Sequence, residues 1–234
     1  MLQEAIYKSF KYVVGFDTEF RGSIKDGERN QVICFVYKDF KTGKYTKTYG
    51  KDLKKLPFPK KSTLFIAHNV GAETHSMLSM NMGRAKYLWD TMIEDKKLFG
   101  GRVKGHGLLH LANRYDLDGV ISENLKKYYI DLILSKENYT TDELNKIINY
   151  CKSDVDTLEK VFYKQLKSIE EINNEDGPRD IISRALFSGA AMAVTAQVEF
   201  TGIPINKKLL DLLTHNFPLL RKEIMKDINK RLDI

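Results

Sequence analysis

The chain has 234 residues, with 38 basic and 31 acidic side chains and a formal net charge of +7 at pH 7. This length suits one domain of ordinary size, or one domain with an extra helical piece, and can bury a core without disulfides. No apolar run approaches the ~18 residues of a membrane span, and the first residues lack the apolar core of a signal peptide. Cys34 and Cys151 stand in hydrophobic contexts without metal-ligand spacing, which predicts buried free thiols. We therefore expect a cytoplasmic protein in a reducing compartment, and not a secreted, membrane or disulfide-framework protein.

Positive charge concentrates in one stretch of the sequence. Residues 38–61 contain nine lysines against two aspartates. A basic surface favours a polyanionic partner such as nucleic acid. A solvated hairpin and loop would explain the same lysines equally well, so this segment alone does not decide the partner.

The first third of the chain is typical of β-strands, and helical patterns follow. β-branched and aromatic runs predict strands at 11–20, 31–40, 41–50 (with a turn at Thr42-Gly43), 63–68 and 86–90. Helices are expected at 70–82, with Asn69 as N-cap, then at 106–115, from 140 to about 172, and at 180–200 and 206–232. The segment 173–180 is typical of a linker, because Gly177-Pro178 interrupts helical structure. This order indicates an α/β protein with a mixed sheet covered by helices.

Two acids stand at the end of the first predicted strand. Asp17 and Glu19 are two residues apart, so strand alternation points them to the same face. Like charges that close are costly unless a cation neutralises them. Acid pairs at this spacing also occur by chance, so the pair gains weight only from its place after an apolar strand.

A third acid follows another apolar strand. In His68-Asn69-Val70-Gly71-Ala72-Glu73 the acid falls in the first turn of the expected helix. A carboxylate there stabilises the helix through the dipole alone, which is the plainer explanation of Glu73.

The fourth acid lies on the late helix. Tyr150 and Asp154 are four residues apart and share a helix face, whereas Asp156 is about 240° around the helix from Tyr150. The geometry therefore selects Asp154 over Asp156 as the acid that shares a site with Tyr150. A core tyrosine beside a solvated acidic face is the structural alternative.

Together these segments resemble the three exonuclease motifs of the DEDD superfamily, tyrosine subtype. The order agrees, as does the separation of over a hundred residues between first and last motif. The resemblance is closest to the 3′–5′ proofreading domain of family A DNA polymerases, especially phage-encoded ones. Trp89-Asp90-Thr91-Met92 looks like the family's D-T-M segment, 108–112 looks like the helix that follows it, and 190–206 resembles the turn that leads toward the polymerase thumb.

The resemblance implies an RNase H-like mixed β-sheet flanked by helices, with C-terminal linker helices. It places the exonuclease domain at 1–175 and the helical extension at 176–234. The implied activity is metal-dependent removal of nucleotides from DNA 3′ ends, in the host cytoplasm if the protein is phage-encoded. No polymerase motif is present, so the chain is either a piece of a longer polymerase or a stand-alone exonuclease. A polymerase domain is thus a candidate partner, and a membrane is not.

The resemblance also assigns roles to the acids. Two Mg²⁺ or Mn²⁺ ions are implied, which suits hard carboxylate ligands. Asp17, Glu19 and Asp154 would hold the first ion, Asp17 would bridge both, and Tyr150 would orient the attacking water. Glu73 would complete the site, directly or through water. The commonest family pattern has Asp at this last position, and we expect the longer Glu to preserve activity.

A single-stranded or frayed 3′ end is the expected substrate, because a cleft that excludes a duplex can admit one strand. Phe20 is the candidate for stacking on a base, although core packing explains its ring equally well. His68 and Asn69 are candidate substrate contacts, and His68 also suits a structural role at the strand end. Two alternatives remain: an RNase D-like 3′–5′ exoribonuclease, and a non-catalytic nucleic-acid-binding module of the same fold.

Overall fold

The computed structural model describes residues 1–22, 29–172 and 175–232 and contains a five-stranded mixed sheet. The strand order is β3-β2-β1-β4-β5; β1 to β3 pair antiparallel, and β4 and β5 continue the sheet in parallel. The strands are β1 (Tyr12–Arg21), β2 (Gln31–Asp39), β3 (Tyr45–Tyr49), β4 (Thr63–Ala67) and β5 (Tyr87–Asp90). All five agree with the sequence prediction to within a few residues. The protein therefore has the RNase H-like α/β fold that the sequence predicted.

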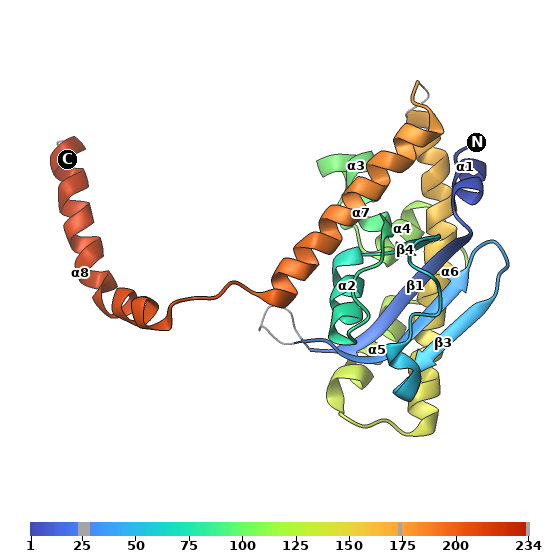
Figure 1. Ribbon diagram of the computed structural model, residues 1–234, viewed down its shortest axis with the longest axis horizontal. Coiled ribbons are helices and arrows are strands. Elements are labelled where there is room, and N and C mark those ends of the chain that lie inside the picture. The colour runs from blue at the N-terminus through green and yellow to red at the C-terminus, as the bar shows by residue number, and fades with distance from the viewer. Residues whose placement is uncertain (23–28, 173–174, 233–234) are drawn as a thin grey trace. The chain divides into compact units, whose positions relative to one another are not determined.

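Helices flank this sheet (Figure 1). They are α1 (Leu2–Ser9), α2 (Val70–Ser79), α3 (Thr91–Phe99), α4 (Leu108–Arg114), α5 (Glu123–Ser135), α6 (Thr141–Ile172), α7 (Pro178–Thr201) and α8 (Lys207–Leu232), with short 3-10 turns η2 (Gly50–Lys54) and η3 (Gly100–Arg102). The sequence analysis did not predict α1, α3 or α5. Helix α1 forms because Leu2 and Ile6, one turn apart, are both fully buried in the core.

Side chains alternate across the central strand β1. Val13 packs into the core that contains α6, whereas Val14 and Phe16 pack into the core on the α2 side. Gly15 allows a close approach, since a Cβ at this position would lie 2.2 Å from the ring of Phe40. The odd-numbered positions that follow, 17 and 19, therefore face α6.

Helix α6 is the longest element and runs the length of its unit (Figure 1). Its 32 residues correspond to about 48 Å. A capping box starts it: Glu143 N–H donates to the Thr140 hydroxyl at 3.3 Å, and Thr140 N–H donates to the Glu143 carboxylate at 3.0 Å. Its second half packs into the core through residues such as Phe162 and Leu166, and its first half packs against β2 through residues such as Ile147 and Val155.

Helix α7 differs from the expectation that no segment is long and apolar enough to span a membrane. By length and composition it could cross a membrane, which the search for apolar runs did not anticipate. A single such helix is weak evidence, and a third of its apolar window is buried within the protein. Gly189 brings α7 against the backbone of β5, because a Cβ there would lie 2.1 Å from the Leu88 carbonyl oxygen.

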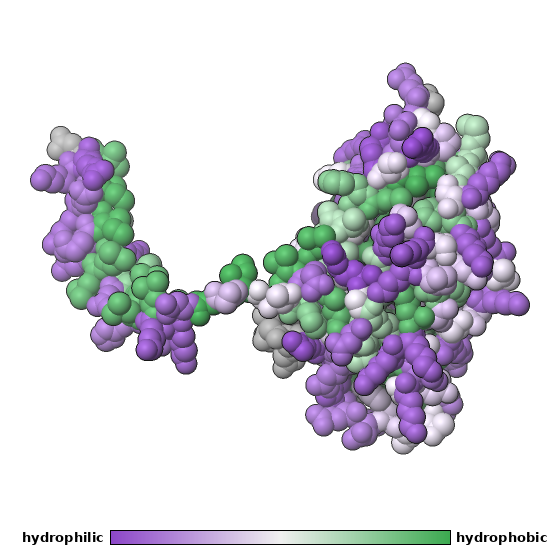
Figure 2. Space-filling model, in the orientation of Figure 1, coloured by the Kyte–Doolittle hydropathy of each residue, from purple (hydrophilic) through white to green (hydrophobic). Residues whose placement is uncertain are grey.

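The chain forms two compact units, Met1–Phe200 and Thr201–Ile234. The predicted domain boundary at 175/176 stays a prediction. In the second unit, α8 carries apolar side chains along one side (Figure 2). They include Leu209, Leu210, Leu213, Phe217, Leu220, Ile224, Ile228 and Leu232, all of them exposed.

Candidate active site

The paired acids of β1 lie close together, as the strand spacing predicts. Ligand atoms of Asp17, Glu19 and Cys151 all lie within 4.8 Å of one another. A β-bulge interrupts the pairing of β1 with β2 directly after Glu19. Bulges re-aim side chains next to functional sites, and this one falls where the acid pair ends.

Glu73 approaches the same region from the first turn of α2. It is buried, and the Thr18 side chain of β1 acts against the rise in its pKa. Its Oε2 atom is buried and has no hydrogen-bond partner among the described residues. Burial and then the charge of Asp17 raise its pKa well above the usual range. A helix-stabilising acid would stay in solvent, so this geometry favours a ligand role.

The helix capping that the sequence assigned to Asn69 is performed by Asp90. Asn69 occupies the N-cap position with φ 73°, but its side chain makes no capping bond. Instead the buried Asp90 accepts from Val70 N–H at 2.9 Å and from Met92 N–H at 2.9 Å. One carboxylate thus caps both α2 and α3 and fixes the end of β4 beside Glu73, which gives the Asp90 segment a structural role.

On α6, Tyr150 and Asp154 face the acid pair together. Tyr150 lies one turn before Asp154 on the same helix face, and the charge of Asp154 adds to burial in raising the pKa of the tyrosine. Asp156 turns away, and it accepts from Lys38 at 2.7 Å and from Lys152 at 2.9 Å. The two aspartates thus have different surroundings, and the roles assigned to Tyr150 and Asp154 stay predictions.

The four acids form one electrostatic unit. Burial, followed by the charge of Asp154, raises the pKa of Asp17 to about 8. Burial raises the pKa of Asp154 to about 6, and burial and then Asp17 raise the pKa of Glu19. Glu73 is buried and the other three carboxylates are half-buried, so they resist ionising together, and a divalent cation would relieve their repulsion. The residues therefore fit a metal centre.

Cys151 is a member of the site that the sequence analysis missed. Its thiol lies 3.4 Å from Asp17 Oδ2 and 3.3 Å from the Asp17 carbonyl, and can donate to either. Burial raises the pKa of the thiol, which therefore stays protonated and acts as a donor rather than a ligand. The remaining ligand set is all carboxylate, which suits Mg²⁺ or Mn²⁺. The sequence contains a pattern that indicates this place for Cys151, because Cys151 and Asp154 are three residues apart and share a helix face.

The three predicted substrate contacts lie at the edges of this cluster. His68, at the end of β4, has Nδ1 3.0 Å from the Thr91 hydroxyl, and burial lowers its pKa to about 4, so the ring is neutral. Phe20 is half-buried directly after Glu19, and Asn69 gives its backbone N–H to Asp90. Their roles as substrate contacts stay predictions.

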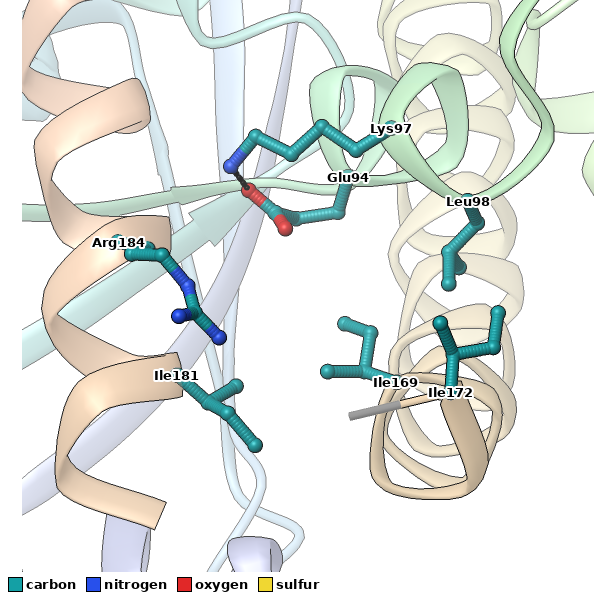
Figure 3. A pocket seen from close by; sticks show the side chains of 7 residues that line it. All are labelled: Glu94, Lys97, Leu98, Ile169, Ile172, Ile181 and Arg184. Carbon is teal, nitrogen blue, oxygen red and sulfur yellow. Dashed lines mark hydrogen bonds and ion pairs between the residues drawn. The ribbon is translucent and has the colours of Figure 1, made fainter. Parts of the chain in front are cut away.

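A cavity of about 210 Å³ is lined by residues of α3, α6 and α7 and by none of these four acids. Figure 3 shows Ile181 and Arg184 of α7 facing Ile169 and Ile172 of α6 across it. Its acid, Glu94, is paired with Lys97 at 2.6 Å. This cavity offers no group of acids, so the carboxylate cluster is the candidate active site.

Comparison of the sequence with protein-family models and with curated proteins finds no match. Similar solved structures include one described as "apo form of the nuclease", with 16% identity over 85% of this chain and 89% of that chain and a TM-score of 0.60. Brucella melitensis NrnC is 18% identical over 83% of this chain and 88% of its own, with TM-scores of 0.55 bound to pGG and 0.52 with bound Mg²⁺.

Escherichia coli RNase D, described as an exoribonuclease involved in structured RNA processing, is 16% identical over 84% of this chain with a TM-score of 0.54. The aligned region covers 47% of RNase D. At these identities the likeness shows a shared fold, and this fold is the one seen in several nucleases.

Proposed function

We propose that this protein is a metal-dependent 3′–5′ exonuclease of the DEDD superfamily, tyrosine subtype. One observation carries the proposal: three segments far apart in the sequence bring Asp17, Glu19, Glu73 and Asp154 into one cluster of interacting charges, with Tyr150 one turn from Asp154. The nuclease neighbours of the same fold support it.

Asp17, Glu19 and Asp154 would hold one divalent ion, and Glu73, with its unpaired oxygen, would complete the site for a second. When bound, the ions supply an activated water and relief of charge on the leaving oxygen. The protein's own part is to hold the carboxylates in place. The Cys151 thiol contributes by donating to Asp17, and Asp90 by fixing the start of α2.

Tyr150 acts as a positioned hydrogen-bond group. Burial and the neighbouring acids raise its pKa, so the phenol stays protonated at neutral pH. A protonated phenol can donate to a neighbouring acid and, through its oxygen lone pairs, accept a hydrogen bond from the attacking water. This arrangement favours an orienting role over a nucleophilic one.

The proposed substrate is a single-stranded or frayed 3′ end of DNA. The resemblance of residues 190–206 to the segment before a polymerase thumb supports DNA, and a proofreading role beside a polymerase domain in the cytoplasm is part of this proposal. RNA is the second candidate, and it is favoured by the neighbours RNase D and NrnC bound to pGG.

The test uses 5′-labelled single strands of DNA and RNA with one sequence, with Mg²⁺ or with a chelator. A ladder that shortens from the 3′ end in Mg²⁺ is the expected result, and a circular single strand should remain uncut. Relative rates on the two strands decide the sugar. Asp17→Asn combined with Glu19→Gln is the matched inactive control, because it keeps the side-chain shapes.

A non-catalytic binding module is the outcome that would overturn the proposal. In that case the folded protein would bind the strands in Mg²⁺ or Mn²⁺ without shortening them. The double variant would then bind nucleic acid at least as well as the wild type, because it removes negative charge near the phosphates.

A further inference from the structure

Helix α5 passes beside the carboxylate cluster and presents one lysine to it. Lys126 lines a narrow cavity together with Tyr150 and Asp154. On α5, Lys126 and Tyr129 are half-buried at i and i+3, whereas Lys127 and Tyr128 between them are exposed. The Tyr129 ring stacks on the Tyr150 ring with centroids 4.6 Å apart, which fixes this face of α5 against the site.

The charge of Lys126 reaches several groups of the site. Burial raises the pKa of Asp17 and Asp154, and the Lys126 charge acts against that rise at both. It also adds to the burial that lowers the pKa of His68. These effects agree with the cavity lining, which places Lys126 beside Tyr150 and Asp154 of α6.

The Lys126 ammonium is not committed to a fixed acid. In the described part of the chain it has no hydrogen-bond or ion-pair partner, although Lys38 and Lys152 are both paired with Asp156. A free cation beside a divalent-metal site weakens metal binding by repulsion. Its position is favourable only when further negative charge enters the site, and a phosphodiester supplies that charge.

We propose that Lys126 contacts the phosphate of the 3′-terminal linkage as that phosphate enters the carboxylate cluster. This inference rests on the proposed exonuclease function. A lysine is suited to the role because its flexible stem delivers a point charge with three donors to a phosphate oxygen. The charge that develops on the phosphate during cleavage would strengthen the contact, so Lys126 should act mainly on kcat.

The kinetic test compares four proteins on a single-stranded substrate in saturating Mg²⁺. Lys126→Met keeps the apolar stem and removes the charge, Lys126→Arg keeps the charge, and Lys127→Gln on the adjacent exposed position is the matched control. We expect Lys126→Met to lose at least about 10-fold in kcat with a smaller change in KM, and Lys126→Arg to retain more activity. Lys127→Gln should stay within about twofold of the wild type.

A binding test locates the contact without relying on catalysis. Affinity is measured in a chelator for two oligonucleotides, one normal and one with an uncharged methylphosphonate at the 3′-terminal linkage. The uncharged linkage should weaken binding to the wild type and to Lys127→Gln. It should have little effect on Lys126→Met, because the partner charge is already missing.

The outcomes separate this inference from the proposed function. If the folded wild type does not cleave, the exonuclease proposal fails. The chelator experiment still tests the Lys126 contact in that case. An equal effect of the uncharged linkage on the wild type and on Lys126→Met refutes the contact. If the wild type cleaves and Lys126→Met has a normal kcat, the inference alone is wrong. Lys126→Gln replaces Lys126→Met in both tests if melting shows that the methionine variant does not fold.

Discussion

The ring of Tyr129 stacks on the ring of Tyr150, with centroids 4.6 Å apart and planes inclined by 14°. Tyr150 therefore has two supports that come from different helices. Its position on α6 puts it one turn from Asp154, and its ring face rests on Tyr129 of α5. The orientation of the phenol relative to the acid pair depends on both.

Removing the stack should slow the enzyme without inactivating it. We expect Tyr129→Leu to lower kcat by about 2- to 12-fold, the equivalent of the 0.5–1.5 kcal/mol of an aromatic pair. Tyr129→Phe keeps the stack and should remain close to the wild type. Lys127→Gln, at a neighbouring exposed position, is the control in the same assay. A Tyr129→Leu enzyme as fast as this control would show that α6 alone positions Tyr150.

Removing the hydroxyl of Tyr150 should have a larger effect than removing the stack. Tyr150→Phe keeps the ring contact with Tyr129 and deletes the group proposed to orient water. We expect kcat to fall by about 10- to 1000-fold, with DNA affinity unchanged. Single-turnover rates and binding in a chelator give the two quantities separately. Normal cleavage by Tyr150→Phe would make this residue a core tyrosine and would contradict the tyrosine-subtype assignment.

The buried acids predict how stability depends on pH. Burial and the charge of Asp154 raise the pKa of Asp17 from its ordinary 3.8 to about 8, so the folded protein holds this proton more tightly than the unfolded chain. Stability of the metal-free protein should therefore fall as pH rises through that window. Mg²⁺ should raise the melting temperature, and more at pH 8 than at pH 5, because it competes with protons for the carboxylates.

The variant Asp17→Asn with Glu19→Gln is the control for this pH dependence. It removes two of the buried charges and should melt higher than the metal-free wild type at pH 8. Its Mg²⁺ response should be much smaller. A metal-free wild type that gains stability relative to this variant between pH 5 and pH 8 would contradict the predicted electrostatics of the cluster.

The sequence predicted most of the sheet and the acids, because both have strong local signals. The apolar strand before Asp17 and Glu19, and the i, i+4 spacing of Tyr150 and Asp154, each fix a direction within one element. Helix α5 lacked such a signal: Leu125, Tyr128, Ile130 and Leu134 are all exposed, so its apolar residues do not outline a buried face.

Contacts between distant elements were beyond the sequence patterns. Nothing local indicates that Asp90 caps two helices, since one of its partners, Val70, lies 20 residues earlier. The bond from Cys151 to Asp17 spans 134 positions and depends on how α6 crosses β1. Such long-range relations are set by packing, and propensity and periodicity do not report them.

The last prediction separates Asp154 from Asp156. The charge of Asp154 acts on Tyr150 and on the acid pair, whereas Asp156 is bound by Lys38, Lys152 and Tyr45. Asp154→Asn keeps the shape but removes an anionic ligand, so cleavage should collapse at ordinary Mg²⁺ concentrations. Mn²⁺ should restore part of it, because Mn²⁺ binds the same kind of oxygen site more tightly.

Asp156→Asn should behave differently in the same measurement, which is the cleavage rate against Mg²⁺ concentration. It weakens two partly buried ion pairs, so a loss of stability of about 1 kcal/mol per pair is expected with a nearly normal rate. The two variants are isosteric and two residues apart, which makes them a matched pair. If Asp156→Asn were the inactive enzyme and Asp154→Asn the normal one, then α6 would not present Tyr150 to the reacting phosphate, and the assignment of the late-helix motif would be wrong.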